Sequence, residues 1–105
     1  MAQFDVFKST NPSTQALYPY LLEIQSDTLR HLQTTAVIPL TATQEYSGKP
    51  LSHLHTSFKI FNKDYIGMTP LIASVDRRIL GDKVTSLAHY RNAIVAALDF
   101  MIDSI

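Results

Sequence analysis

Apolar and polar residues alternate along much of the chain, which is the pattern of β-strands with one buried face. In residues 3–7, Phe4 and Val6 point to one side, and the opposite side carries polar residues and Phe7. Apolar or β-branched segments that predict further strands lie at 17–26, 34–40, 55–61, 65–69 and 71–80. The pattern therefore predicts about five short antiparallel strands.

Residues that favour turns separate these segments. Residues 41–54 are typical of a loop, and residues 62–64 are typical of a hairpin turn between two strands. Pro19 has no N–H group to donate, so we expect it at a strand start or near a sheet edge. We expect Gly81-Asp82 to end the β pattern.

From about Thr85 the period of the apolar residues changes to that of a helix. Apolar residues recur at steps of three or four, with one double step, at Leu87, Ile94, Leu98, Met101 and Ile105. Thr85 or Ser86 could cap the start of this helix. Its last residues are apolar and follow no Gly, Asn, Lys or Arg, so we expect the helix end either to enter the core or to contact another molecule.

These elements predict one domain over residues 1–105, mainly β with a C-terminal α-helix. A sheet this short is expected to curl into a small barrel or a two-layer sandwich, with the helix packed against it. The inward positions of the first two strands and of the helix stripe would form the core; on the strands they are Phe4, Val6, Tyr20, Leu22 and Ile24.

Composition narrows the class of protein. The chain is 46% hydrophobic and 17% charged, which suits a small domain that also buries surface in a dimer. Its net charge of +0 and a single adjacent basic pair, Arg77-Arg78, disfavour a general nucleic-acid binder. With no cysteine, no long apolar run and no signal-peptide pattern, we expect a soluble cytoplasmic protein.

Few residues suggest chemistry. His53 and His55 have the spacing of a metal pair, but two surface histidines are the favoured interpretation, and we predict no metal or cofactor. Ser26-Asp27 with His31 or His89 lacks the sequence context of a nucleophile, which disfavours a hydrolase.

Two further features invite a binding interpretation. Asp99 and Asp103 share one helix face at the negative end of the helix dipole, where carboxylates are unfavourable. Phe7 faces away from the predicted core, so a loop, a dimer partner or a bound protein would have to cover it. The residue pattern alone names no reaction.

Read end to end, the sequence resembles the CcdB family of bacterial toxins. The markers are Gln3-Phe4, Gln25-Ser26-Asp27, "VIPL" at 37–40, "ASV" at 73–75, and Arg91-Asn92 on a helix that precedes a final isoleucine. The order and spacing of these markers, rather than any one of them, carry the resemblance.

The resemblance implies an SH3-like β-barrel of the CcdB/MazF type, assembled as a homodimer. It implies a toxin without catalytic activity that binds the DNA gyrase A subunit and traps the enzyme with its DNA cleaved. A CcdA-like antitoxin would neutralise it, and the pair would repress its own operon, so that DNA is contacted only through the antitoxin complex.

The resemblance also implies a gyrase-binding surface. On the strands and loops it comprises Gln3 and Ser26, which match the family, Leu29, which replaces another aliphatic residue, and Phe7, which replaces a tyrosine. On the helix it comprises Asp99, Ile102, Asp103, Ser104 and Ile105. The chain departs from the family's best-known tail, Trp-Gly-Ile, where it has Asp103-Ser104-Ile105.

Two other functions stay open. One is an endoribonuclease like the MazF and Kid toxins, for which Arg77, Arg78 and His89 are the candidate residues. The other is a CcdB-like remnant that has lost toxicity and only binds antitoxin, an alternative that the missing tryptophan keeps open.

Overall fold

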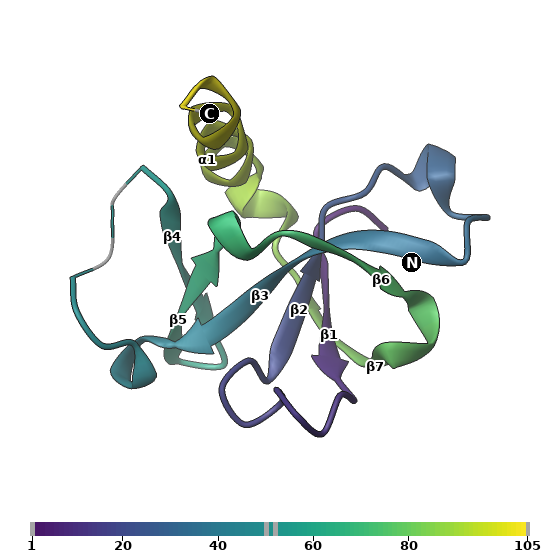
Figure 1. The fold of residues 1–105 in the computed structure, drawn as a ribbon, viewed down its shortest axis with the longest axis horizontal. Coiled ribbons are helices and arrows are strands. Elements are labelled where there is room, and N and C mark those ends of the chain that lie inside the picture. Colours follow the sequence, from purple (N-terminus) through teal and green to yellow (C-terminus); the bar gives the residue numbers. More distant parts are fainter. Residues whose placement is uncertain (1, 50, 52, 105) are drawn as a thin grey trace.

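The chain folds into a curved antiparallel sheet with one helix beyond its β3, β4 and β5 side (Figure 1). The computed structural model describes residues 2–49, 51 and 53–104. Its strands are β1 (Asp5–Ser9), β2 (Tyr20–Glu23), β3 (Thr34–Ala42), β4 (His55–Ile60), β5 (Lys63–Met68), β6 (Ala73–Asp76) and β7 (Leu80–Ser86). The α-helix, α1, covers Arg91–Asp103.

The sheet has the order β4-β5-β3-β2-β1-β7, and β6 pairs with β3 off this path. β3 is long enough to pair with two strands on one edge, β6 along residues 34–37 and β5 along residues 40–42. Pro39, which has no N–H, lies between these two pairings, where no ladder bond is needed. In the described part of the chain β4 and β7 do not pair, so the sheet curls without closing. The predicted mainly β class with a C-terminal helix is confirmed.

The core lies between the concave face of the sheet and the start of the helix. The predicted inward positions are correct: Phe4, Val6 and Leu22 are buried in it, and Tyr20 and Ile24 pack against it. Phe4 lies just before β1 with φ 71°, which is unusual for a large side chain. Its N–H donates to Glu23 O (2.7 Å) and its carbonyl accepts from the Leu87 N–H (2.8 Å), so β2 and the end of β7 fix this conformation together.

The β4–β5 hairpin turns one residue earlier than predicted. Ile60 pairs with Lys63, which leaves Phe61 and Asn62 as a two-residue turn with φ 51° and 64°. Positive φ at both central residues is the geometry that matches the twist of the flanking strands. Phe61, at its first position, is 76% exposed.

The prediction that Gly81-Asp82 ends the β pattern is wrong. β7 runs through both residues and pairs with β1, with irregularities in the register. A Cβ on Gly81 would lie 3.0 Å from Lys8 O, so glycine is what allows the two strands to approach. The predicted strand 71–80 is divided instead, because Asp76 Oδ1 accepts from the Arg78 N–H (2.8 Å) and begins a 3-10 turn at Arg77–Ile79.

The helix begins six residues later than predicted from Thr85. Residues up to Ser86 belong to β7, and a 3-10 turn, Ala88–Tyr90, comes before α1. The predicted cap by Thr85 or Ser86 is wrong, because the residue at the N-cap of α1 is Tyr90, without a side-chain cap bond. The Ser86 Oγ instead accepts from the Ala88 N–H (3.2 Å) at the start of the 3-10 turn. The single strand predicted at 71–80 therefore becomes two, β6 and β7, and the described residues form seven strands where about five were predicted.

The first turns of α1 anchor it to the sheet. Ile94 and Ala97 are buried, and the helix packs against β4 and the 3-10 turn Thr69–Leu71. The Tyr90 hydroxyl accepts from the Lys59 N–H on the free edge of β4 (3.2 Å), and the Tyr90 ring meets Phe58 edge-on at 5.0 Å. The last turn of α1 extends beyond these contacts. Among the residues described, no helix combines the length and the hydrophobicity needed to cross a membrane.

Candidate protein-binding surface

The last turn of α1 exposes an apolar residue among carboxylates. Ile102 is 60% exposed, and Asp99, Asp103 and Ser104 are also exposed. These four predicted site residues therefore lie together at the surface, and we call residues 99–104 the helix tip. The fifth predicted residue of this group, Ile105, lies outside the described residues.

The helix tip is held by its own bonds. The Ser104 hydroxyl donates to Phe100 O (2.7 Å) and the Ser104 N–H donates to Met101 O (3.3 Å). Although no Gly or Asn follows the helix, the serine hydroxyl satisfies one of its terminal carbonyls. Asp99 and Asp103 lie at the negative end of the helix dipole, where carboxylates are unfavourable. The last turn has no basic residue to offset their charge.

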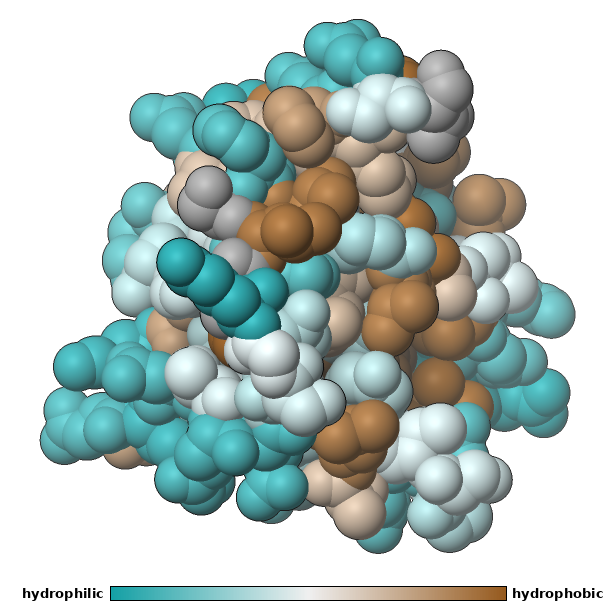
Figure 2. Space-filling view, turned by 60° about the vertical axis from the view of Figure 1, so that its left-hand side comes forward, coloured by the Kyte–Doolittle hydropathy of each residue, from teal (hydrophilic) through white to brown (hydrophobic). Residues whose placement is uncertain are grey.

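Apolar surface continues around the helix tip. Figure 2, which brings the β4 and β5 side forward, shows brown apolar patches among teal polar ones. Phe100, 42% exposed, stacks on His53 with ring centres 4.9 Å apart. Leu71 is 44% exposed in the 3-10 turn that packs against α1. A partner that binds the helix tip would therefore meet a second exposed apolar side chain there, Phe100.

The second group of predicted residues comprises Ser26 and Leu29, on the loop between β2 and β3, and Gln3, which bonds to it. The Gln3 N–H donates to Asp27 Oδ1 (2.7 Å), and its side-chain amide donates to Ile24 O (3.1 Å). Ser26 caps the 3-10 turn Asp27–Leu29, because its Oγ accepts from the Thr28 N–H (3.2 Å). Gln3 and Ser26 are therefore brought together, and Leu29 is 46% exposed beside them.

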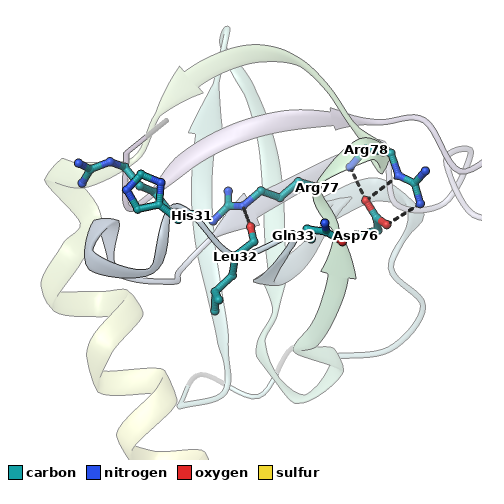
Figure 3. A pocket seen from close by; sticks show the side chains of 7 residues that line it. His31, Leu32, Gln33, Asp76, Arg77 and Arg78 are labelled. Atoms are coloured by element: carbon teal, nitrogen blue, oxygen red, sulfur yellow. Dashed lines mark hydrogen bonds and ion pairs between the residues drawn. The ribbon is translucent and has the colours of Figure 1, made fainter.

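Arg77, which lies between β6 and β7, hydrogen-bonds the same loop (Figure 3). The Arg77 Nε–H donates to Leu32 O (2.7 Å), and Nη1 donates to Glu23 Oε2 (2.9 Å). Glu23 is 3% exposed, and the Thr35 hydroxyl donates to the same oxygen (2.5 Å). The sequence suggested Arg77 only as part of a basic pair and a nuclease candidate, and it gave no indication of Glu23 or Thr35. Arg77 and Glu23 are 54 positions apart, and no pattern of hydrophobic residues links them.

A cavity of about 610 Å³ opens beside this arrangement (Figure 3). It is lined by Arg30, His31, Leu32, Gln33, Asp76, Arg77 and Arg78. The Arg78 guanidinium hydrogen-bonds Asp76, with Nη2 2.8 Å from Oδ2, and holds the pKa of that carboxyl at about 2. The lining therefore contains three arginines, of which two are already engaged with carboxylates.

Phe7 does not belong to the surface of this chain. It is 5% exposed, and its strand neighbour Leu21, also buried, lies opposite it in the β1–β2 register. It faces away from the main core as predicted, but the chain itself covers it. The proposed role of Phe7 as an exposed contact is corrected accordingly: its side chain supports the outer face of the sheet.

The residues considered for catalysis or metal binding are scattered. His55 is buried, and its Nδ1 accepts from the Leu51 N–H (2.9 Å), while His53 stacks on Phe100. Ser26 Oγ lies 2.9 Å from the Thr28 hydroxyl, and His89 packs against the Tyr90 ring. In residues 2–49, 51 and 53–104, no group of three or more His, Cys, Asp or Glu could hold a metal ion.

The fold is that of a class of small bacterial toxins. The Mycobacterium tuberculosis toxin MazF-mt6 superposes with a TM-score of 0.74 at 16% identity, over 94% of this chain and 96% of that one. An endoribonuclease in complex with its cognate antitoxin, from mycobacterial species, gives 0.75 at 16% identity over 98% and 95%. A structure described as an Mtb toxin gives 0.69 at 18% identity over 90% and 97%. At these identities the likeness concerns the fold.

The sequence places the chain within that class. The profile of the family described as CcdB protein matches residues 3–104, nearly the whole chain. The chain belongs to the CcdB family, and the resemblance inferred from its scattered markers is confirmed.

Proposed function

We propose that this protein is the toxin of a type II toxin–antitoxin system, and that it binds the DNA gyrase A subunit and traps the gyrase–DNA cleavage complex. Membership of the CcdB family supports the toxin assignment. Gyrase poisoning is the activity that the family resemblance implies, and it requires a binding surface rather than reacting groups.

The observation that carries this proposal is the exposed helix tip. Ile102 is 60% exposed at the end of an ordered helix, next to Asp99 and Asp103. An apolar group kept at the surface among unfavourably placed carboxylates is better explained by a partner than by stability. The loop that carries Ser26 and Leu29 supplies a second ordered contact region.

We further propose that the protein acts as a cytoplasmic homodimer. Two copies related by a two-fold axis would present two helix tips, which suits a two-fold partner such as paired gyrase A subunits. A CcdA-like antitoxin would cover this surface, and the complex would repress its own operon. One structural neighbour is described as bound to its cognate antitoxin, which supports a partner of this kind.

An endoribonuclease is the second candidate, since one of the neighbours is described as an endoribonuclease and the cavity gathers Arg30 and His31 near Arg77. Two observations weigh against it. The guanidinium groups of Arg77 and Arg78 are engaged by Glu23 and Asp76. The net charge of +0 gives little attraction for an RNA backbone.

Overexpression in bacteria with either sensitive or resistant gyrase A tests the proposal. We expect growth arrest only in the sensitive strain, with double-strand breaks in its DNA. Equal arrest in both strains, together with RNA cleavage by the purified protein, would favour the endoribonuclease. Normal growth of both strains, with binding to antitoxin retained, would favour the remnant.

A further inference from the structure

The loop that carries Ser26 and Leu29 has little of its own to hold it in place. The bonds between its own main-chain groups are local, from the Leu29, Arg30 and Leu32 N–H groups to carbonyls three residues earlier, at 3.0–3.1 Å. The adjacent Gln25 side chain adds one long contact, with Nε2 3.4 Å from Leu29 O. Its two leucines do not anchor it by burial, because Leu29 is 46% exposed and Leu32 is 50% exposed. A short 3-10 turn without burial is marginal, so this conformation needs support from outside the loop.

Arg77 gives that support through three main-chain carbonyls of the loop. Its N–H donates to Gln33 O (2.8 Å), and its Nε–H donates to Leu32 O (2.7 Å). Nη2 lies 3.5 Å from Leu29 O, at the far limit of a hydrogen bond. Figure 3 shows the Arg77 side chain reaching the Leu32 carbonyl.

Glu23 and Thr35 fix the direction of that side chain. Nη1 of Arg77 donates to Glu23 Oε2 (2.9 Å), and the Thr35 hydroxyl donates to the same atom. Both acceptor and hydroxyl are buried on paired strands, β2 and β3, which hold them rigidly. A planar guanidinium with one edge on this carboxylate has its remaining N–H groups aimed at the loop, a geometry that a lysine cannot reproduce.

We propose that Arg77, oriented by Glu23 and Thr35, is a positioning residue for partner binding: it holds the Ser26–Gln33 loop in its binding conformation without being a contact itself. This inference rests on the proposed function, because it assigns the loop to the gyrase-binding surface. When a binding conformation is populated only part of the time, the apparent affinity falls by the same fraction.

The test compares three variants of the full-length protein. Arg77→Met removes the clamp but leaves the Glu23 carboxylate buried without its partner, so it is expected to destabilise the fold as well. Glu23→Gln/Arg77→Met removes both charges and keeps an oxygen for the Thr35 hydroxyl. Arg78→Met is the matched control, because Arg78 is the neighbouring arginine and, among the described residues, its guanidinium hydrogen-bonds Asp76 and not the loop.

We expect the double variant to recover most of the stability lost by Arg77→Met and yet to bind a gyrase A fragment about tenfold more weakly than the wild type. Hydrogen exchange of the Arg30 and Leu32 amides should be faster by about the same factor, with core-strand amides unchanged. Arg78→Met should match the wild type in affinity and in loop exchange.

The two readouts separate the inference from the proposed function. If the wild type does not bind the gyrase fragment, the proposed function fails, and the exchange of the loop amides still decides whether Arg77 holds the loop. Unchanged loop exchange in the double variant overturns the inference. So does wild-type affinity in a double variant whose loop exchanges faster.

Discussion

The two candidate contact regions are built in opposite ways. The Ser26–Gln33 loop has few bonds of its own and is held by groups from elsewhere, by the Gln3 N–H near the N-terminus and by the Arg77 side chain between β6 and β7. The helix tip is held by the hydrogen bonds of its own last turn, including that of the Ser104 hydroxyl. Substitutions far from the loop are therefore expected to change its binding, whereas the tip should respond mainly to substitutions within itself.

Within α1, the start of the helix is packed against the sheet and the tip is exposed, so the same substitution should have different effects on stability at the two places. The largest expected effect comes from Ile94→Ala, which removes a side chain that is 1% exposed and should lower the free energy of unfolding by about 3 kcal/mol. Ile102→Ala, with the same chemical change at 60% exposure, should alter it by less than about 0.5 kcal/mol. Urea unfolding of both variants measures the two changes in the free energy of unfolding. Equal losses would show that the tip is packed rather than free.

Asp27 in the loop and Asp103 in the helix tip allow the two regions to be compared with the same residue type. Asp27 accepts the Gln3 N–H at 2.7 Å and so joins the loop to the N-terminal segment. We expect Asp27→Ala to cost about 1 kcal/mol of stability, because that N–H loses its charged acceptor. Thermal unfolding measures the loss, and a variant as stable as the wild type would mean that the loop does not depend on this bond.

Asp103 should behave in the opposite sense. It lies at the negative end of the helix dipole, in a last turn without a basic residue, so Asp103→Asn should stabilise the protein by about 0.5 kcal/mol. The gain should shrink as salt is added, since the charge is exposed. A loss of stability would instead reveal a favourable partner for this carboxylate.

The smallest expected effect concerns the pair beside the loop. Hydrogen bonds from Arg78 lower the pKa of Asp76 from 3.8 to about 2. The carboxylate is therefore favoured in the folded state, and its contribution is present above about pH 4 and disappears as the pH falls towards 2. Unfolding of wild type and Asp76→Asn between pH 5 and pH 2 should show a small difference that vanishes at the acidic end. A constant difference would contradict this assignment.

Local patterns predicted the core better than the boundaries. The alternation identified Phe4, Val6 and Leu22 correctly, because side-chain direction along a strand depends only on neighbouring positions. It failed at Gly81, where close packing against Lys8 keeps a glycine inside a strand. It also failed at the helix start. The Leu87 N–H bonds to Phe4 O, so this part of the chain continues alongside β1 before the helix begins. A contact between residues so far apart in the sequence leaves no local signal.

The candidate site was predictable only in part. The family resemblance pointed to Ser26, Leu29 and the helix tip, and the structure places their described residues on ordered, accessible segments. Periodicity could not reveal the bond between Arg77 and Glu23, which are 54 positions apart and meet only in the folded sheet. Nor could it show that the chain itself buries Phe7.

Calorimetric titration of a gyrase A fragment with the wild type and with Ile102→Ala and Leu29→Ala tests the central claim most directly. We predict binding of one toxin dimer per two-fold gyrase fragment, and at least about tenfold weaker binding by each variant, which is the loss typical of an interface hot spot. Because both side chains are exposed, the variants should stay folded. Absence of binding by the wild type, or wild-type affinity in both variants, would contradict the account.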